Sequence, residues 1–289
     1  MPLQLWAVDV SGHARALPDA AAVARARLPA SEAEVVARFV RAIDRARSLA
    51  GKLLLRLALC EVEPACAAAG WQALRFDKTR EGRPFLVHPA MPLDFNISHD
   101  GDWVVLALQR DAASRVGVDV MELALPHFER DVASFVETME LALTPRETAW
   151  VLAATTGAGG YEARQAEALR RLYDLWTHKE AYTKALGLGL GFDFARLELR
   201  LGDAREQRSV RCALLSDGKE EPRFVFTELL LPPGAERGQA PPTPGEGTGL
   251  PSQLVPAGRA AGGQERRLAA HDDARWVARG VTGSYKCHR

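Results

Sequence analysis

The chain of 289 residues has few cysteines, no excess of charge of either sign and no long hydrophobic run. Its four cysteines, at positions 60, 66, 212 and 287, are too scattered for a disulfide framework and lack the neighbouring Cys/His pair of a zinc site. Lys plus Arg and Asp plus Glu both number 37, and this balance argues against bulk nucleic-acid binding. Charged residues interrupt the apolar stretches before they could span a membrane, and the N-terminus lacks a signal-peptide pattern. We therefore expect a cytoplasmic protein with reduced thiols.

Hydrophobic periodicity predicts two long helices among many short strands. A capping box of Ser31 and Glu34 predicts a helix that starts near Ala33 and runs to Cys60. A second long helix is expected over Gln165–Leu186, because its apolar residues have helical spacing and a glycine follows. Shorter helices are expected near Phe128–Phe135 and Pro145–Leu152. Other apolar segments are short and bounded by turn residues, which is typical of strands: 3–10, 74–76, 85–87, 94–99, 103–109, 115–121, 194–201, 210–215 and 224–231.

The C-terminal part differs in composition from the rest. Residues 232–263 are rich in Pro and Gly and have almost no aromatic or β-branched side chains. Such a stretch cannot bury enough apolar surface to offset its ordering entropy, so we predict disorder there. Beyond it, Arg275–Val281 has the pattern of one last strand.

Two of the predicted strands carry polar side chains suited to chemistry. Residues 95–99, FNISH, end on Ser98 and His99, which by themselves could simply start a turn. Residues 116–120, VGVDV, place Asp119 in an apolar strand. A buried carboxylate is unfavourable unless it is paired or bound to a metal, so Asp119 is either salt-bridged to an arginine or part of a site.

The second long helix carries a further polar group. Trp176, Glu180 and Lys184 recur every four residues and therefore share one helix face. Glu180 and Lys184 could equally be an ordinary surface ion pair, worth ~0.2–0.5 kcal/mol. The glycines of 187–191, GLGLG, follow a helix instead of opening one after a strand, so they do not indicate a dinucleotide site.

Together and in this order, FNISH, GVD and WTHKEAYTK resemble the motifs of the 4′-phosphopantetheinyl transferase superfamily. The chain length suggests its larger, surfactin-synthetase-activating type, and the closest resemblance is to the eukaryotic cytosolic group that serves aminoadipate-semialdehyde dehydrogenase. The match covers about residues 3–230 and resumes at Asp272–Val281. It implies an enzyme, a holo-[acyl-carrier-protein] synthase, that moves phosphopantetheine from coenzyme A to a carrier-protein serine and releases adenosine 3′,5′-bisphosphate.

The resemblance also implies a Mg²⁺ site. The family's metal ligands match Asp119 and Glu180, and oxygen ligands of this kind suit Mg²⁺, which keeps several waters and phosphate oxygens. Bacterial members carry a third acidic ligand where this chain has Met121. Glu122 is adjacent, but strand alternation should point it to the opposite face, so we do not assign it to the metal.

The residues that match family contacts to coenzyme A are Arg47, Arg83, Ser98, His99, Lys179 and Lys184. Ser98 and His99 match the pair on the 3′-phosphate side of the adenosine, and Lys184 matches a phosphate contact. Arg41 is a weaker candidate. A local basic pocket in a neutral protein suits a multiply phosphorylated ligand.

Proton removal from the carrier serine requires a base nearby, and the resemblance offers Glu180 and Glu147 without choosing between them. The carriers it suggests are those of fatty-acid synthase and aminoadipate reductase. A monomer is the family expectation.

The implied fold is α+β, with two similar α/β lobes related by a pseudo-twofold axis. We expect the lobes at 1–113 and 114–231, then a disordered insert at 232–263 and a tail at 264–289. In the family two adjacent strands close the second lobe, here 224–231 and Arg275–Val281. The long connection between them adds little closure entropy, ~0.6 kcal/mol per doubling of its length. Alternatively, the tail comes from a splice variant or a translated intron.

Two other functions are compatible with parts of the sequence. A non-catalytic coenzyme A or carrier-domain binding protein would fit the missing third ligand, although it would not need to keep Asp119, Glu180 and Lys184. The arginines of Arg38–Arg56 could form a basic helix for membranes or nucleic acid. They are spread around the helix, however, which argues against this function.

Overall fold

The computed structural model describes residues 3–11, 20–111, 114–189, 191–201, 212–221, 223–231, 255–257 and 276–284. These residues form two compact units. The first takes its residues from Met1–Ala112 and Pro233–Arg266, and the second from Ala113–Pro232 and Arg267–Arg289. Each unit therefore includes a piece of the C-terminal part, which the sequence had predicted to be a separate insert and tail.

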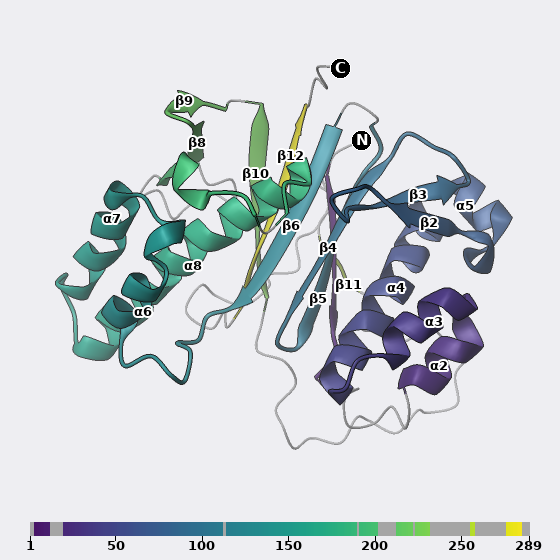
Figure 1. The fold of residues 1–289 in the computed structure, drawn as a ribbon, viewed down its shortest axis with the longest axis horizontal. Coiled ribbons are helices and arrows are strands. Elements are labelled where there is room, and N and C mark those ends of the chain that lie inside the picture. The colour runs from purple at the N-terminus through teal and green to yellow at the C-terminus, as the bar shows by residue number, and fades with distance from the viewer. Residues whose placement is uncertain are drawn as a thin grey trace. The chain divides into compact units, whose positions relative to one another are not determined.

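The first unit combines an antiparallel sheet with a group of helices (Figure 1). The described strands of the sheet have the order β11 (Val255–Ala257), β1 (Gln4–Asp9), β5 (Trp103–Gln109) and β4 (Asp94–Asp100), and each is antiparallel to its neighbours. The helices and the separate hairpin are α2 (Ala20–Arg27), α3 (Ala30–Ala37), α4 (Ala42–Val62), α5 (Pro64–Ala69), η1 (Trp71–Ala73), β2 (Arg75–Lys78) and β3 (Pro84–His88).

The core of this unit forms where α4 meets the sheet. Leu55 and Leu59, one helical turn apart, are buried with Phe95 of β4 and Leu106 of β5. Because α4 keeps its apolar side chains at helical spacing, one face of the helix is buried along its length. Each fully buried leucine contributes roughly 1.5–3 kcal/mol relative to an exposed one.

The single helix predicted from Ala33 to Cys60 is interrupted, so that prediction was wrong in detail. Helix α3 starts after Pro29 without a side-chain cap, so the expected Ser31–Glu34 capping box does not start it. The helix packs instead against α2, where Ala33 belongs to a second hydrophobic cluster. The chain turns between α3 and α4, and Arg45 Nη1 donates to the carbonyl oxygens of Phe39 and Val40, both at 2.8 Å.

The second unit is built around α8 (Tyr161–Leu186), which lies across a three-stranded sheet in Figure 1. The antiparallel sheet has the order β10 (Phe224–Leu231), β12 (Trp276–Ser284) and β6 (Ser114–Glu122). Other elements are α6 (Val132–Thr138), η2 (Glu140–Ala142), α7 (Pro145–Thr155), η3 (Phe194–Arg196), β7 (Leu197–Leu201), β8 (Cys212–Ser216) and β9 (Lys219–Glu220).

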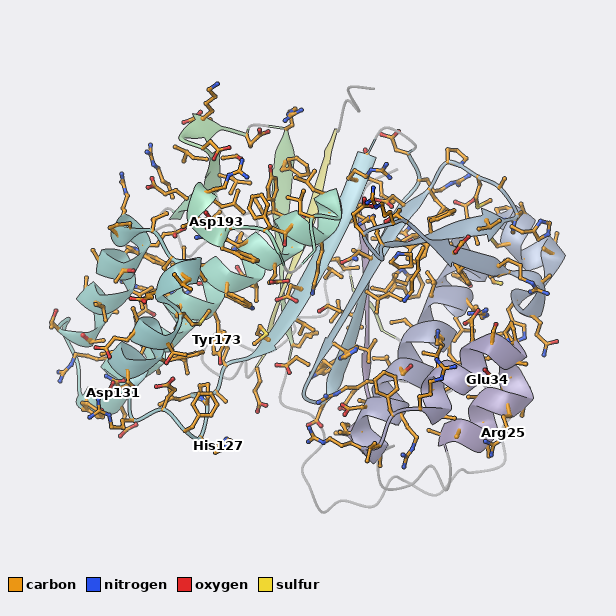
Figure 2. The ribbon with its side chains drawn as sticks, in the orientation of Figure 1. Arg25, Glu34, His127, Asp131, Tyr173 and Asp193 are labelled. Atoms are coloured by element: carbon orange, nitrogen blue, oxygen red, sulfur yellow. The ribbon has the colours of Figure 1, made fainter. Side chains whose placement is uncertain are left out.

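Local contacts fix the helices of this unit. Asp131, labelled in Figure 2, is the N-cap of α6. It forms a reciprocal capping box with Ser134. Tyr173 of α8 donates its hydroxyl to the carbonyl of Ala124 at 2.8 Å, which ties the helix to the segment after β6. Helix α8 ends where expected, because Gly187 has φ 68° and takes the left-handed conformation that favours glycine.

The last strand is confirmed, and it lies in the middle of a sheet. The prediction covered Arg275–Val281, and β12 extends over Trp276–Ser284. It pairs with β10 on one side and β6 on the other. Of the stretch 232–263, for which the sequence predicts disorder, the structure describes only Val255–Ala257, and these residues pair with β1 as a strand. The rest of that stretch lies outside the described residues.

The mixed α and β content, with small antiparallel sheets, agrees with the predicted α+β class. Within the described ranges no helix has both the length and the hydropathy needed to cross a membrane.

Candidate active site

Asp119 lies in the middle of β6, and its side chain is buried. The residue is 4% exposed, and the apolar side chains of Val118 and Val120 flank it in the sequence. Its Oδ1 accepts a hydrogen bond from Lys184 Nζ of α8 at 2.5 Å. The sequence left open whether an arginine pairs with this carboxylate, and the structure supplies a lysine. The antiparallel register of β12 also places Arg279 opposite Asp119.

Glu180 stands one helical turn before Lys184 and belongs to the same group of charges. It is 9% exposed, and burial raises the pKa of its carboxyl group. Lys184 opposes that rise in pKa, and the negative charge of Asp119 adds to it. Two carboxylates and one ammonium therefore interact across the contact between β6 and α8.

The donor set fits Mg²⁺. Mg²⁺ prefers oxygen ligands and usually takes only one or two carboxylates from protein, with phosphate and water oxygens for the rest. Asp119 and Glu180 supply that number. Among the residues the structure describes, no cluster of three or more His, Cys, Asp or Glu side chains could hold a metal. Met121, at the position of the third bacterial ligand, packs against the hydrophobic core of the unit.

Glu147 and Lys179 lie in the interior, which differs from the roles expected of them. Lys179 Nζ contacts Glu147 Oε2 at 2.6 Å, and each side chain is 1% exposed. Glu147 also caps α7 through Thr144 and accepts from the backbone N–H of Leu199 at 2.8 Å. Sequence spacing shows neither the contact with Lys179 nor that with Leu199, because these partners come from separate elements.

In the first unit, Arg47 of α4 lies beside the turn that joins β4 to β5. Its Nε donates to the carbonyl of Gly101 at 2.7 Å, and its Nη1 contacts Asp44. Ser98 and His99 lie near the end of β4 that leads into this turn; Ser98 is buried and His99 exposed. The structure thus brings Arg47 close to the chain segment that carries the Ser-His pair.

Arg83 is held at the other end of β4. Its Nη2 contacts Asp94 Oδ2 at 2.5 Å, and both side chains are buried. Asp94 precedes Ser98 by four residues, roughly 13 Å along an extended strand. Arg83 therefore does not join Arg47 at the turn. The weaker candidate, Arg41, is the exposed N-cap residue of α4.

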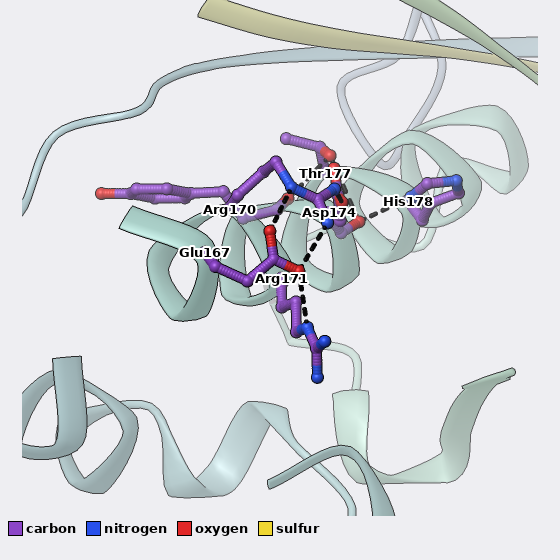
Figure 3. Close-up of polar contacts among 7 residues, drawn as sticks. Glu167, Arg170, Arg171, Asp174, Thr177 and His178 are labelled. Carbon is purple, nitrogen blue, oxygen red and sulfur yellow. Dashed lines mark hydrogen bonds and ion pairs between the residues drawn. The ribbon is translucent and has the colours of Figure 1, made fainter. Parts of the chain in front are cut away.

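A polar network on α8 was missed by the sequence analysis (Figure 3). Arg170 contacts Glu167 at 3.0 Å and the buried Asp174 at 2.5 Å, and Arg171 also contacts Glu167. His178 Nδ1 lies 2.5 Å from the carbonyl oxygen of Asp174. The spacing of three and four residues between Glu, Arg and Asp was the signal available. The network links successive turns of the helix that carries Glu180 and Lys184.

Comparison with known proteins gives the family. A sequence model described as "4'-phosphopantetheinyl transferase, N-terminal" matches residues 16–111, and that of the 4'-phosphopantetheinyl transferase superfamily matches residues 115–227. A phosphopantetheinyl transferase of Thraustochytrium sp. is 36% identical over 230 residues, covering 78% of this chain and 73% of that one.

Two further relatives carry names of the same kind. The 4'-phosphopantetheinyl transferase pptA of Paxillus involutus is 38% identical, over 56% of this chain and 60% of its own length. The human L-aminoadipate-semialdehyde dehydrogenase-phosphopantetheinyl transferase is 32% identical, over 68% of this chain and 61% of its own. The chain thus spans less than two thirds of the length of these two relatives.

The family matches and the first relative agree with the motifs that form the site. The chain belongs to the 4′-phosphopantetheinyl transferase superfamily and is a transferase of that kind, which confirms the resemblance seen in the sequence.

Proposed function

We propose that this chain transfers the 4′-phosphopantetheine arm of coenzyme A to a serine hydroxyl of an apo carrier protein. The serine oxygen forms a bond to the β-phosphorus, the bond from that phosphorus to the bridging oxygen breaks, and adenosine 3′,5′-bisphosphate leaves. The observation that carries the proposal is the contact of Asp119 with Lys184 beside Glu180, which gathers two carboxylates and an ammonium. Anionic ligands and a divalent cation are what such a group recognises.

Asp119 and Glu180 are the residues that would hold Mg²⁺. When bound, the ion neutralises charge that develops on phosphate oxygens as the leaving group departs. Lys184 Nζ supplies a second positive charge and, besides the N–H that it donates to Asp119, further N–H donors for a phosphate oxygen. Its side chain is more exposed than that of Asp119, which supports a role toward a ligand.

The proton of the attacking serine passes to Glu180 in this proposal. Glu180 belongs to the charged group at which the serine must attack, and a carboxylate there can accept its proton. The other candidate, Glu147, already accepts hydrogen bonds from Lys179, Thr144 and Leu199 inside the unit. Those contacts support a structural role for Glu147, and likewise for Lys179, so we leave both out of the proposed reaction.

Arg47, Ser98 and His99 are proposed to bind the 3′-phosphate side of the nucleotide. The contact of Arg47 with the Gly101 carbonyl, next to the Ser-His pair, supports this assignment. Arg83 is proposed to add positive charge from the start of β4. The carriers proposed are those of fatty-acid synthase and aminoadipate reductase, the latter in keeping with the human relative's name. We propose that the protein acts in the cytosol as a monomer.

The test is the mass of an apo acyl-carrier protein incubated with this chain, coenzyme A and Mg²⁺. We expect a gain of one phosphopantetheine, abolished by EDTA and by Asp119→Ala or Glu180→Gln. Glu137→Gln, on the exposed side of α6, removes a comparable charge elsewhere in the unit and should leave transfer intact. If coenzyme A binds and no carrier gains mass, the chain is a binding protein and the proposal is wrong.

A further inference from the structure

Gly117 of β6 lies closer to the backbone of α8 than a residue with a side chain could. We propose that Gly117 is a positioning residue for the transfer reaction, because its missing Cβ sets the spacing between β6 and α8 at which Asp119 meets Lys184 and Glu180. The inference rests on the proposed function in so far as these three residues form the site. Gly117 itself touches no reacting group.

The contact is between backbones. A Cβ built on Gly117 would lie 1.9 Å from the carbonyl oxygen of Ala181 and 2.7 Å from the amide nitrogen of Ala185. Real Cβ atoms essentially never come within 3.0 Å of such atoms. No change of side-chain rotamer can relieve a clash with a helix backbone, so any other residue here must push α8 away from β6.

The part of α8 that would be displaced carries the residues of the candidate active site. Gly117 and Asp119 are two residues apart on the strand and so share one face, which is the face toward α8. Ala181 directly follows Glu180, and Ala185 directly follows Lys184. A shift that opens the gap at Gly117 therefore moves the two helix residues that must meet Asp119.

The hydrogen bond from Lys184 to Asp119 would be among the first contacts to break. Its length is 2.5 Å, and a hydrogen bond of this kind weakens steeply when its heavy atoms separate beyond about 3.5 Å. An opening of the order of 1 Å is enough to misplace the charges, and misplacement by that amount can lower a rate about 100-fold.

The chain offers a matched control in Gly51. This glycine also lies where a helix, α4, meets a sheet, but a Cβ there would contact Ile97 at 3.5 Å and Val104 at 3.6 Å, which are ordinary van der Waals distances. The same substitution, glycine to alanine, is thus accommodated at one helix–sheet contact and excluded at the other.

The first experiment compares Gly117→Ala with Gly51→Ala in the carrier-mass assay. We expect kcat to fall about 100-fold for Gly117→Ala with the KM for the carrier little changed, and no loss for Gly51→Ala. In the Gly117→Ala background, trimming Ala181→Gly should restore nothing, because the obstacle is a backbone carbonyl. Wild-type kcat in Gly117→Ala, or its recovery on trimming Ala181, would overturn the proposal.

The second experiment is a double-mutant cycle in urea that does not depend on activity. Lys184→Met should lower the unfolding midpoint of the wild type, yet change it little in Gly117→Ala, because the contact with Asp119 is already broken there. Additive losses would mean that Gly117 packs without placing the site. The cycle also distinguishes the positioning role of Gly117 from the proposed transfer activity. Its result on unfolding remains valid even if no carrier protein is modified.

Should Gly117→Ala fail to fold, Ala181→Ser provides a milder test. It adds one oxygen to the fully buried side chain of the residue whose backbone carbonyl meets Gly117. Because that side chain has no free space around it, the added atom should shift the backbone of α8 at this position. We expect a smaller loss of kcat in a folded protein. Full kcat in Ala181→Ser would then contradict a positioning role for this contact.

Discussion

The carboxylate of Glu147 and the ammonium of Lys179 form an ion pair of 2.6 Å in which each side chain is 1% exposed. Lys179 Nζ also donates to the carbonyl of Ala142 at 2.7 Å, and Glu147 accepts from the N–H of Leu199 in β7. The pair thus joins α7, α8, η2 and β7. Burial lowers the pKa of Lys179, and the charge of Glu147 opposes that change. Inside the second unit, the charge of Glu147 therefore compensates that of Lys179.

Glu147→Gln should therefore destabilise the second unit strongly. Removing one partner of a buried ion pair leaves the other charge unpaired and typically lowers the free energy of unfolding by about 3–5 kcal/mol. The measurement is urea unfolding followed by circular dichroism. Asp217→Asn, which breaks the half-exposed pair with Arg196, is the control and should leave the midpoint unchanged.

The same variant separates a structural role of Glu147 from a catalytic one. If Glu147 only supports the fold, kcat per folded molecule should stay near that of the wild type under conditions where Glu147→Gln is folded. A general base typically contributes about 10²–10⁴-fold to a rate. A loss of kcat on that scale, in protein shown to be folded, would make Glu147 the base instead of Glu180.

Removal of residues 264–289 should prevent the second unit from folding. This segment contains β12, which pairs with both β10 and β6, so its loss leaves two strands with unpaired backbone groups beside a buried core. Near-ultraviolet circular dichroism and limited proteolysis would report the loss.

A deletion of residues 236–250 is the comparison for that truncation. It removes Pro- and Gly-rich chain, by sequence, and leaves every described strand in place. We expect it to keep the thermal midpoint and the transfer activity of the full chain. A truncated protein without 264–289 that still unfolds cooperatively at the wild-type temperature would show that β12 is dispensable.

The thiol of Cys66 should resist alkylation in the folded protein. Its side chain is 0% exposed, and burial raises its pKa to about 11, with smaller contributions from Cys60 and Glu63. We expect iodoacetamide to label Cys66 at pH 8 only after unfolding in urea, as read by peptide mass mapping. Cys60, which is partly exposed, is the internal control and should react before Cys66.

The raised pKa also gives a sign for the pH dependence of stability. The thiol pKa is higher in the folded than in the unfolded chain, so its contribution is complete below the ordinary value of 9.0 and is lost as the pH rises through about 11. Cys66→Ala should reduce the fall in the urea midpoint over that interval. An unchanged pH profile in the variant would assign the fall to other groups.

Much of the local structure follows from the sequence. The apolar spacing of α4 and α8, the stop at Gly187 and the short strands around Asp119 were all predicted, because each depends on residues within a few positions of one another. The break between α3 and α4 was not predicted. The break accompanies the packing of α3 against α2, a tertiary contact that the helical spacing of residues 33–60 does not show.

The candidate site, too, was predicted in part from the sequence and in part was not. The motifs singled out Asp119, Glu180 and Lys184. An aspartate within an apolar strand and polar residues spaced every four positions along a helix can both be recognised from the sequence alone. The pairing of Lys179 with Glu147 and of Arg83 with Asp94 was not visible. Their residue types suggested that Lys179 and Arg83 contact a ligand. Only the structure shows that each is already paired with a buried carboxylate of the protein.

The sequence by itself determined the family, most of the helices and strands, and the residue types that the chemistry needs. The tertiary structure decided which of those residues meet. It set the 2.5 Å contact of Lys184 with Asp119, and it placed β12 between β10 and β6. The physical reason is that such contacts depend on how closely whole elements pack, and at Gly117 that closeness is possible because no Cβ stands between β6 and the backbone of α8.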